Sequence, residues 1–311
     1  MAPKRRLKAV RAIEANVGTR NAYAKKLLNL SRAFNLFVFE ECVLHLMDTH
    51  SLAMDASLSR PRSKRDKERL RKLQLRLSAL MRAHPEQVKN DLDGFIQTHL
   101  AQWAGQLKTQ TQKLTKWFVT TTARDVTTTM RRVLISAGFP PDYMSERWTV
   151  PIVRGQYMSQ QAAANIGNHI EWATNLITKM HVKDVQRLQE VLLEGILKGQ
   201  NLQEIRDTLM QFKGFDEKRA SRVALDQINK INGAIQRDNA KALGIMQAFW
   251  VHVPGQYSSR ETHIHMNGKL FDLDKGLYDE DVNKYVVPGE LPYCRCVCRY
   301  SLPNVLPESK K

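Results

Sequence analysis

The sequence is organised around one stretch near its C-terminal end, FWVHVPGQYSSRETHIHMNGKLFDLDKGLYDEDVNKYVVPGELPYCRCVCRY at residues 249–300. Three of the four cysteines alternate with other residues in its last part, and residues two apart share one face of a β-strand. Asn267-Gly268, Lys275-Gly276 and Pro288-Gly289 are pairs typical of turns. The stretch therefore predicts a small module of short strands joined by turns.

Five side chains of this module are of the types that bind zinc, which takes four nitrogen or sulfur ligands in structural sites. They are His263, His265, Cys294, Cys296 and Cys298. Their His-x-His and Cys-x-Cys spacings differ from the common Cys-x-x-Cys spacing, and on a regular strand residues two apart lie roughly 6.5–7 Å apart. Two alternatives follow: a structural zinc, or reduced thiols that pack the module while His263 forms a hydrogen bond within it.

A cysteine and a histidine could also act as nucleophile and base. The sequence, however, contains no nucleophile elbow, no phosphate-binding glycine loop and no metalloprotease helix motif. We therefore expect no catalytic residues. Arg260 and His263 are expected to fix the loop between strands by hydrogen bonds. Trp250 is expected to anchor the core, and Gly268 to adopt a positive φ at a turn.

The chain before this module has the apolar spacing of helices, so we predict a mainly α fold in which long N-terminal and central helices precede a small C-terminal α+β module. Within residues 1–58, Leu7, Val10, Ile13 and Val17 have the spacing of one helical face. We divide the chain into a basic helical region at 1–84, a helical middle region at 85–180, a region at 181–303 with helices at 181–243 and the strand-and-turn module at 246–300, and a tail at 304–311.

Several helices can be placed individually. Leu70, Leu73, Leu77 and Leu80 are spaced like a heptad seam, which predicts a packed helix after a basic linker at 59–63. Further helices are predicted at 86–136, at about 156–198, at 201–212 and from 216 to about 243. Gly244 is well placed to end the last of them.

The net charge of +17 at a sequence pI of about 9.8 is unusual for a globular chain. Residues 1–84 contain 19 Lys and Arg against 7 Asp and Glu, which accounts for 12 of the 17 excess charges. Such an excess increases self-repulsion, and it points to a polyanionic partner at the N-terminal region.

One helix carries much of this charge, and its candidate phosphate-binding residues are Arg60, Arg62, Lys64, Arg65, Lys67, Arg69, Arg71, Lys72 and Arg76. Clustered basic residues suffice for non-specific phosphate contacts, which depend strongly on salt. No helix-turn-helix, zinc-finger or aromatic RNA-binding signature indicates sequence reading. The alternatives are a solvated basic face on a packed helix and, for a basic amphipathic helix, a membrane surface.

The remaining features of the sequence exclude other classes. No run of about 18 apolar residues exists, so we expect no membrane span, and no apolar region follows the basic start as in a secretory signal. Cys42 stands alone in a helical segment and is expected to be buried. The cysteine count indicates synthesis in a reducing compartment rather than a disulfide scaffold.

Between residues 180 and 300, a set of motif residues follows one order along the chain. They are Gly199, Ile205, Leu209, Arg219-Ala220, Arg222, Ala224, Gly244-Ile245, Trp250, Arg260, His263, Gly268 and Pro292-x-Cys294-Arg295-Cys296. Their order resembles the phage Mu F-like minor head morphogenesis family. The sequence departs from that family's pattern at Gln256 and at Asp226-Gln227.

The resemblance implies a structural, non-enzymatic minor head protein of a tailed bacteriophage, made in the host cytoplasm and built into the virion at the portal vertex or head interior. The implied partners are the portal protein and the major capsid or scaffold proteins, with several copies around the portal. The basic N-terminal region would contact packaged DNA without sequence preference. Two other classes stay open: a nucleic-acid-binding protein outside any virion, and a small enzyme or toxin-like module at the C-terminal end.

Overall fold

The computed structural model describes residues 9–49, 64–153, 155–200, 204–205, 207–208, 217–254 and 259–302. The chain forms two compact units that do not follow the chain order. Unit 1 comprises Met1–Lys25, Lys113–Ala173 and Ala220–Lys311, and unit 2 comprises Lys26–Gln112 and Thr174–Arg219.

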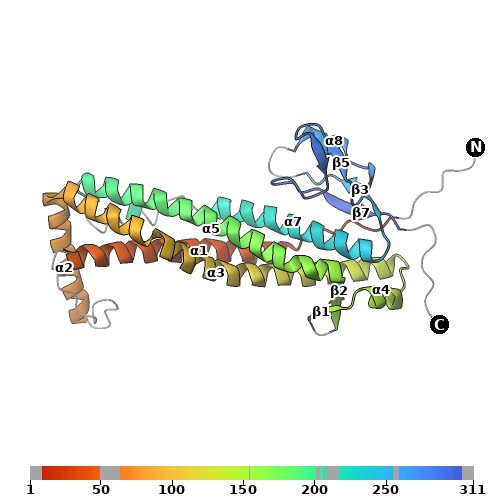
Figure 1. Cartoon of the computed structure of the whole chain (residues 1–311), viewed down its shortest axis with the longest axis horizontal. Helices are drawn as coiled ribbons and strands as arrows, with labels where there is room; N and C mark the ends of the chain where they lie inside the picture. Colours follow the sequence, from red (N-terminus) through yellow and green to blue (C-terminus); the bar gives the residue numbers. More distant parts are fainter. Residues whose placement is uncertain are drawn as a thin grey trace, which may run out of the picture. The chain divides into compact units, whose positions relative to one another are not determined.

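Long helices, drawn as coiled ribbons in Figure 1, make up most of the described chain. The helices are α1 (Val17–Thr49), α2 (Lys64–Ala83), α3 (Pro85–Ser136), α4 (Pro141–Arg147), α5 (Gln160–Leu197), α7 (Glu217–Ala242) and α8 (Glu261–His265). The strands are β1 (Val150–Val153), β2 (Gln156–Met158), β3 (Gln247–Val251), β4 (Leu270–Asp272), β5 (Leu277–Asp279), β6 (Lys284–Val286) and β7 (Val297–Tyr300). The predicted fold class, mainly α with a C-terminal module of short strands, is confirmed.

Helix α3 continues through its threonines, whose hydroxyls form hydrogen bonds within the same helix. Thr122 Oγ1 donates to the carbonyl of Phe118 at 2.9 Å, and Thr128 Oγ1 donates to that of Arg124 at 2.7 Å. Pro85 begins the helix, where its missing N–H is not needed. Among the described residues, no helix combines the length and apolar character needed to cross a bilayer.

Unit 2 is built on a core of buried apolar side chains. The leucine spacing correctly predicted α2, whose Leu73 and Leu77 are buried in this core. Trp103 of α3 and Leu188 of α5 belong to the same core, and so does Cys42 of α1, which is buried as expected. The predicted helix at 201–212 falls largely outside the described residues.

The helical prediction for residues 1–58 is wrong for residues 9–16. Val10 and Ile13 are buried, as their apolar character suggests, but the segment forms no helix. The Val10 amide donates to the carbonyl of Tyr300 at 3.0 Å, and Ala9 pairs with Ser301 beyond the end of β7. Pairing with a distant strand therefore overrides the local helical spacing. Leu7 and residues 50–63 lie outside the described residues.

The strand module, defined here as residues 247–302 of unit 1, is organised around β3. Strands β4 and β7 pair with its two edges, antiparallel, and β5 pairs with β6. Figure 1 shows these strands beside α7, which belongs to the same unit. The three predicted turns have glycines at φ +79°, +78° and +83°, at Gly268, Gly276 and Gly289. The β1–β2 hairpin was not predicted, and α5 begins only at Gln160.

Candidate metal centre

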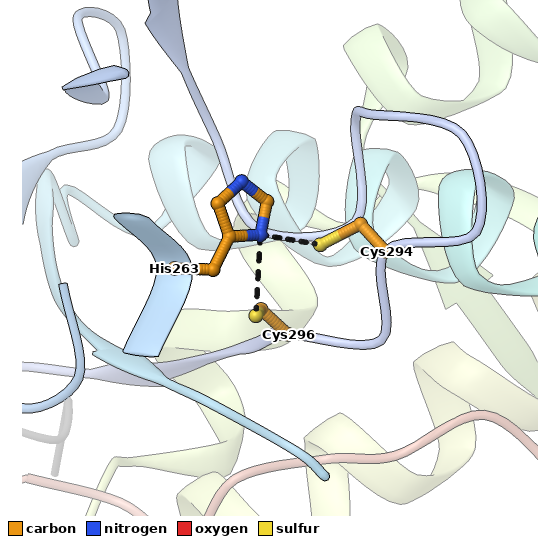
Figure 2. Close-up of side chains that lie close together, drawn as sticks. All are labelled: His263, Cys294 and Cys296. Carbon is orange, nitrogen blue, oxygen red and sulfur yellow. Dashed lines mark hydrogen bonds between the residues drawn. The ribbon is translucent and has the colours of Figure 1, made fainter. Parts of the chain in front are cut away.

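Three of the five predicted ligands converge on one point of the strand module. Figure 2 shows both sulfurs directed at the same ring nitrogen of His263. Sγ of Cys294 lies 3.4 Å from His263 Nδ1, and Sγ of Cys296 lies 3.7 Å from it. All three side chains are buried, and their ligand atoms lie within 4.8 Å of one another. The arrangement could hold a metal ion.

The structure places the other two predicted ligands elsewhere. His263 and His265 lie in the one-turn helix α8, where residues two apart point in different directions, and His265 is exposed. Cys294 and Cys296 precede β7, whereas Cys298 lies within it and is buried near Tyr300 and Arg237. The structure therefore brings Cys294 and Cys296 together with His263, but not with Cys298 or His265.

A buried carboxylate orients His263 from the opposite side of its ring. Nε2 of His263 lies 3.1 Å from Oδ2 of Asp279, which is fully buried at the end of β5. Oδ1 of the same carboxylate accepts the amide of Asp281 at 3.0 Å. The Trp250 ring, fully buried on β3, lies edge-on to His263 with 5.1 Å between ring centres. His263 therefore has a fixed orientation.

Helix α7 holds the loop that carries the cysteines. Asp226 Oδ1 accepts the amide of Tyr293 at 2.6 Å, and Asn229 Nδ2 donates to the carbonyl of Cys294 at 3.2 Å. Tyr293 has φ +60°, a conformation that costs a non-glycine residue about 1–3 kcal/mol. The contact from Asp226 stabilises this strained turn, which directs Cys294 toward His263.

Two other motif residues join the loop to α8. Arg260, the residue before α8, donates from Nη2 to the carbonyl of Pro292 at 3.1 Å. Gly268 ends the turn after α8 and donates its amide to the carbonyl of Trp250 at 2.8 Å. Gln256 lies outside the described residues.

The three central groups influence one another's ionisation. Hydrogen bonding with Cys296 lowers the pKa of Cys294 to about 4, and His263 contributes in the same direction against the effect of burial. The same pairing, together with burial, raises the pKa of Cys296. Burial acts to lower the pKa of His263, but Cys294 and Asp279 outweigh it and leave that pKa raised. These shifts favour a thiolate at Cys294 over one at Cys296.

A fourth donor, His252, was not predicted from the sequence. Its Nδ1 lies 3.6 Å from Sγ of Cys296, and its amide donates to Oδ1 of Asn267 at 2.9 Å. His252 follows the last residue of β3, eleven residues before His263, and this spacing matches no familiar ligand pair. The signal in the sequence was only a histidine two residues after the core residue Trp250.

Comparison with known proteins finds a family that is similar to the same region. Residues 186–299, which include all of these donors, match the family described as Phage Mu protein F like protein. Because of this similarity, residues 186–299 are called the Phage Mu F-like region. The chain is also 25% identical over 126 residues to "Uncharacterized protein YqbB" of Bacillus subtilis (strain 168), covering 40% of this chain and 39% of that protein.

A second relative is an "Uncharacterized protein" of Haemophilus influenzae (strain ATCC 51907 / DSM 11121 / KW20 / Rd). It is 25% identical over 122 residues, covering 39% of this chain and 26% of that protein. The chain thus spans about two fifths or less of the length of these relatives. No solved structure matches the chain.

The Phage Mu F-like region also has a hollow of about 450 Å³ beside the candidate metal centre. His252, His263, Cys294 and Cys296 line it together with Arg222, Arg260 and Arg295. Two chemistries are compatible with this geometry: metal binding by the nitrogen and sulfur donors, or a Cys294 nucleophile with His263 as its base and Asp279 as the group that orients the base.

The predicted phosphate-binding residues lie outside the Phage Mu F-like region. Arg71, Lys72 and Arg76 are exposed on α2, opposite the buried leucines. The side chains of Lys64, Arg65, Lys67 and Arg69 are outside the described part of α2, and Arg60 and Arg62 are outside the described residues. These three side chains share the exposed side of α2 with Leu75 and with Glu68, whose carboxylate lies 3.9 Å from the Arg71 guanidinium.

Proposed function

We propose that this chain is a minor head protein of a tailed bacteriophage and acts as a structural component in head morphogenesis. The observation that carries this proposal is the match of residues 186–299 to the Phage Mu protein F like family. Among the described motif residues of the strand module, Arg260 contacts the Pro292 carbonyl and Trp250 packs against His263. A structural role fits this arrangement, because these side chains hold other parts of the module in place.

The proposed partners are the portal protein and the major capsid or scaffold proteins of the same phage. Several copies would surround the portal, in the head interior or at the portal vertex, after synthesis in the host cytoplasm. The test is genetic, in the phage that encodes the chain. Disruption of the gene should reduce the yield of DNA-filled heads, and mass spectrometry should find the protein in purified wild-type particles. Its absence from the particles would overturn the proposal.

Contact with packaged DNA is a separate part of the proposal and is supported by charge. Helix α2 buries Leu73, Leu77 and Met81 and leaves Arg71 and Arg76 exposed, so its basic side is available to a partner. DNA carries one negative charge per about 1.7 Å of its axis, and basic side chains that neutralise phosphates release counterions. Binding of this kind is independent of DNA sequence and weakens steeply as salt increases.

A salt series on purified full-length protein tests this contact. We expect Arg71→Gln/Lys72→Gln/Arg76→Gln to reduce the dependence of log affinity on log salt concentration by up to about 2.7, or about 0.9 per lost phosphate contact. The matched control is Lys108→Gln/Lys113→Gln/Lys116→Gln, which removes the same charge from exposed positions of α3. Equal slopes for the two triple variants would remove α2 as the DNA-contacting surface.

A further inference from the structure

Three side chains of the strand module, His263, Cys294 and Cys296, have separations expected of ligands around one metal ion, and a fourth side chain, His252, contacts one of them. In a tetrahedral zinc site, with Zn–S near 2.3 Å and Zn–N near 2.0–2.1 Å, a sulfur and a nitrogen ligand lie about 3.6 Å apart. The three sulfur–nitrogen contacts among His252, His263, Cys294 and Cys296 measure 3.4, 3.6 and 3.7 Å. We propose that these four side chains bind one structural zinc ion.

The orientation of His263 supports a metal site over a simple hydrogen bond. One ring nitrogen faces two sulfurs, whereas a hydrogen bond from Nδ1 requires only one acceptor. The other nitrogen faces the buried Asp279 carboxylate. Histidines that bind metals almost always donate their second N–H to such a carboxylate or carbonyl, which fixes the ring and increases its basicity. His263 therefore binds the ion through Nδ1.

The donor set selects zinc and a structural role. Two thiolates and two imidazoles are the ligands of closed, four-coordinate zinc sites, whereas catalytic zinc sites keep one position open for water. His252 supplies the fourth position from the end of β3, where the Asn267 side chain holds its backbone. It contacts Cys296 directly, whereas His263, Cys294 and Cys296 form the compact triad.

The zinc ion would join three parts of the strand module. His252 follows β3, His263 lies in α8, and Cys294 and Cys296 precede β7. The strands of this module are only three to five residues long, and such strands are weakly stable without further support. Small modules commonly obtain that support from a metal or a disulfide.

Two other chemistries compete for the same residues. A Cys294 nucleophile with a His263 base would use one sulfur and one histidine and would leave Cys296 and His252 without a role. A disulfide between Cys294 and Cys296 would leave neither thiol available, and all four cysteines are free in this structure. Both alternatives predict a protein without zinc, so metal content separates them from the proposal.

The experiment uses the full chain, purified without chelator from cells grown with added zinc. Elemental analysis should find about one zinc per chain, the content of a single closed site. Cys294→Ser and Cys296→Ser should lose the metal. The matched controls His265→Gln and Cys298→Ala should keep it, since those side chains lie outside the set. Circular dichroism of each variant checks that the helices remain folded.

Cobalt substitution of the wild-type protein provides a second readout that needs no variant. The cobalt form should show thiolate charge-transfer absorption and the intense visible bands of a tetrahedral ion. His252→Gln should bind cobalt more weakly and change these bands, whereas an unchanged spectrum and affinity would remove His252 from the ligand set.

Three results would overturn the zinc site itself. The first is a metal-free wild-type protein in which Cys294 alone is alkylated rapidly, which indicates a nucleophile. The second is a metal-free protein in which Cys294 and Cys296 form a disulfide. The third is loss of zinc in Cys298→Ala to the same extent as in Cys294→Ser, with the helices intact.

Discussion

Unit 2 and the strand module of unit 1 are stabilised in different ways. The core of unit 2 consists of large apolar side chains from long helices, among them the almost completely buried Leu77 and Trp103. The strand module also buries Trp250 and Tyr300, but beside them lie the buried polar groups of His263 and Asp279 and three cysteines. Unit 2 relies on many apolar contacts, whereas the strand module depends on a few specific polar and sulfur contacts.

The difference follows from the length of the elements. A long helix satisfies its own backbone hydrogen bonds and presents an apolar stripe that repeats every three to four residues. A strand of three residues forms few ladder bonds and buries one or two side chains. The strand module must therefore use side-chain contacts, such as the one from Asp226 to the amide of Tyr293, to fix its loops.

Removal of the proposed zinc should have the largest effect and should act on one region alone. Structural zinc contributes about 10–16 kcal/mol of apparent binding free energy in small zinc-dependent folds. After chelation, we expect amides of β3 and β7 to lose hydrogen-exchange protection by several orders of magnitude, whereas α2 and the unit 2 part of α3 keep theirs. Added zinc should restore the protection. Unchanged exchange of β3 would show that the module is stable without metal.

Replacing one buried tryptophan in each region compares the two cores directly. Trp103→Ala and Trp250→Ala should each reduce the free energy of unfolding by about 3–5 kcal/mol, because each removes a large, almost fully buried side chain. Only Trp250→Ala should also weaken zinc binding, since its ring lies edge-on to His263. Urea unfolding and zinc content measured on both variants check this. Equal zinc affinity in the two variants would show that packing of Trp250 does not support the metal site.

The sequence predicted much of the helical part of the fold but only part of the site. Apolar periodicity located α2 and most of α3, because a long amphipathic pattern reports directly on helix packing. It failed at Val10 and Ile13. Val10 pairs with the end of β7, and the carbonyl of Ile13 accepts a hydrogen bond from Gln236 of α7, both far away in the chain. The His-x-His spacing also predicted that His263 and His265 lie on one strand, whereas the structure has the short helix α8 there.

The site residues show the same limit. The Cys-x-Cys motif indicated donors, but the sequence could not show that Cys294 and Cys296 precede the strand and turn together toward one histidine. Asp279 and His252 belong to the site through contacts across 16 and 44 residues. The first contact joins β5 to α8, and the second joins the end of β3 to the residue before β7. No local pattern in the sequence reports these contacts.

The carboxylate behind His263 should have an intermediate effect on metal binding. Asp279→Asn keeps the shape of the side chain but removes the charge that orients the ring, so zinc affinity should fall about 10- to 100-fold. Competition with a chromophoric chelator measures this. The control is Asp281→Asn, which changes an exposed carboxylate in contact with Thr262. An equal loss in both variants would indicate a general charge effect rather than orientation of His263.

The smallest effects come from one glycine in each region, and they should have opposite signs. Gly276 in the strand module has φ +78°, and an added Cβ would lie 2.2 Å from the carbonyl oxygen of Val286. A non-glycine residue at such a φ costs about 1–3 kcal/mol, and this backbone contact adds to the cost. Gly276→Ala should therefore destabilise the module, measured as faster hydrogen exchange of β5 and β6.

Gly105→Ala in unit 2 should instead stabilise the protein by about 0.5–1 kcal/mol. Gly105 is exposed within α3, and an added Cβ would meet no atom within 4 Å. The substitution reduces the conformational freedom of the unfolded chain and adds no strain to the helix. Urea unfolding followed by circular dichroism measures the gain. A loss of stability here would show that the long helix is as sensitive to local detail as the strand module, because this position tests helical propensity without any packing contact.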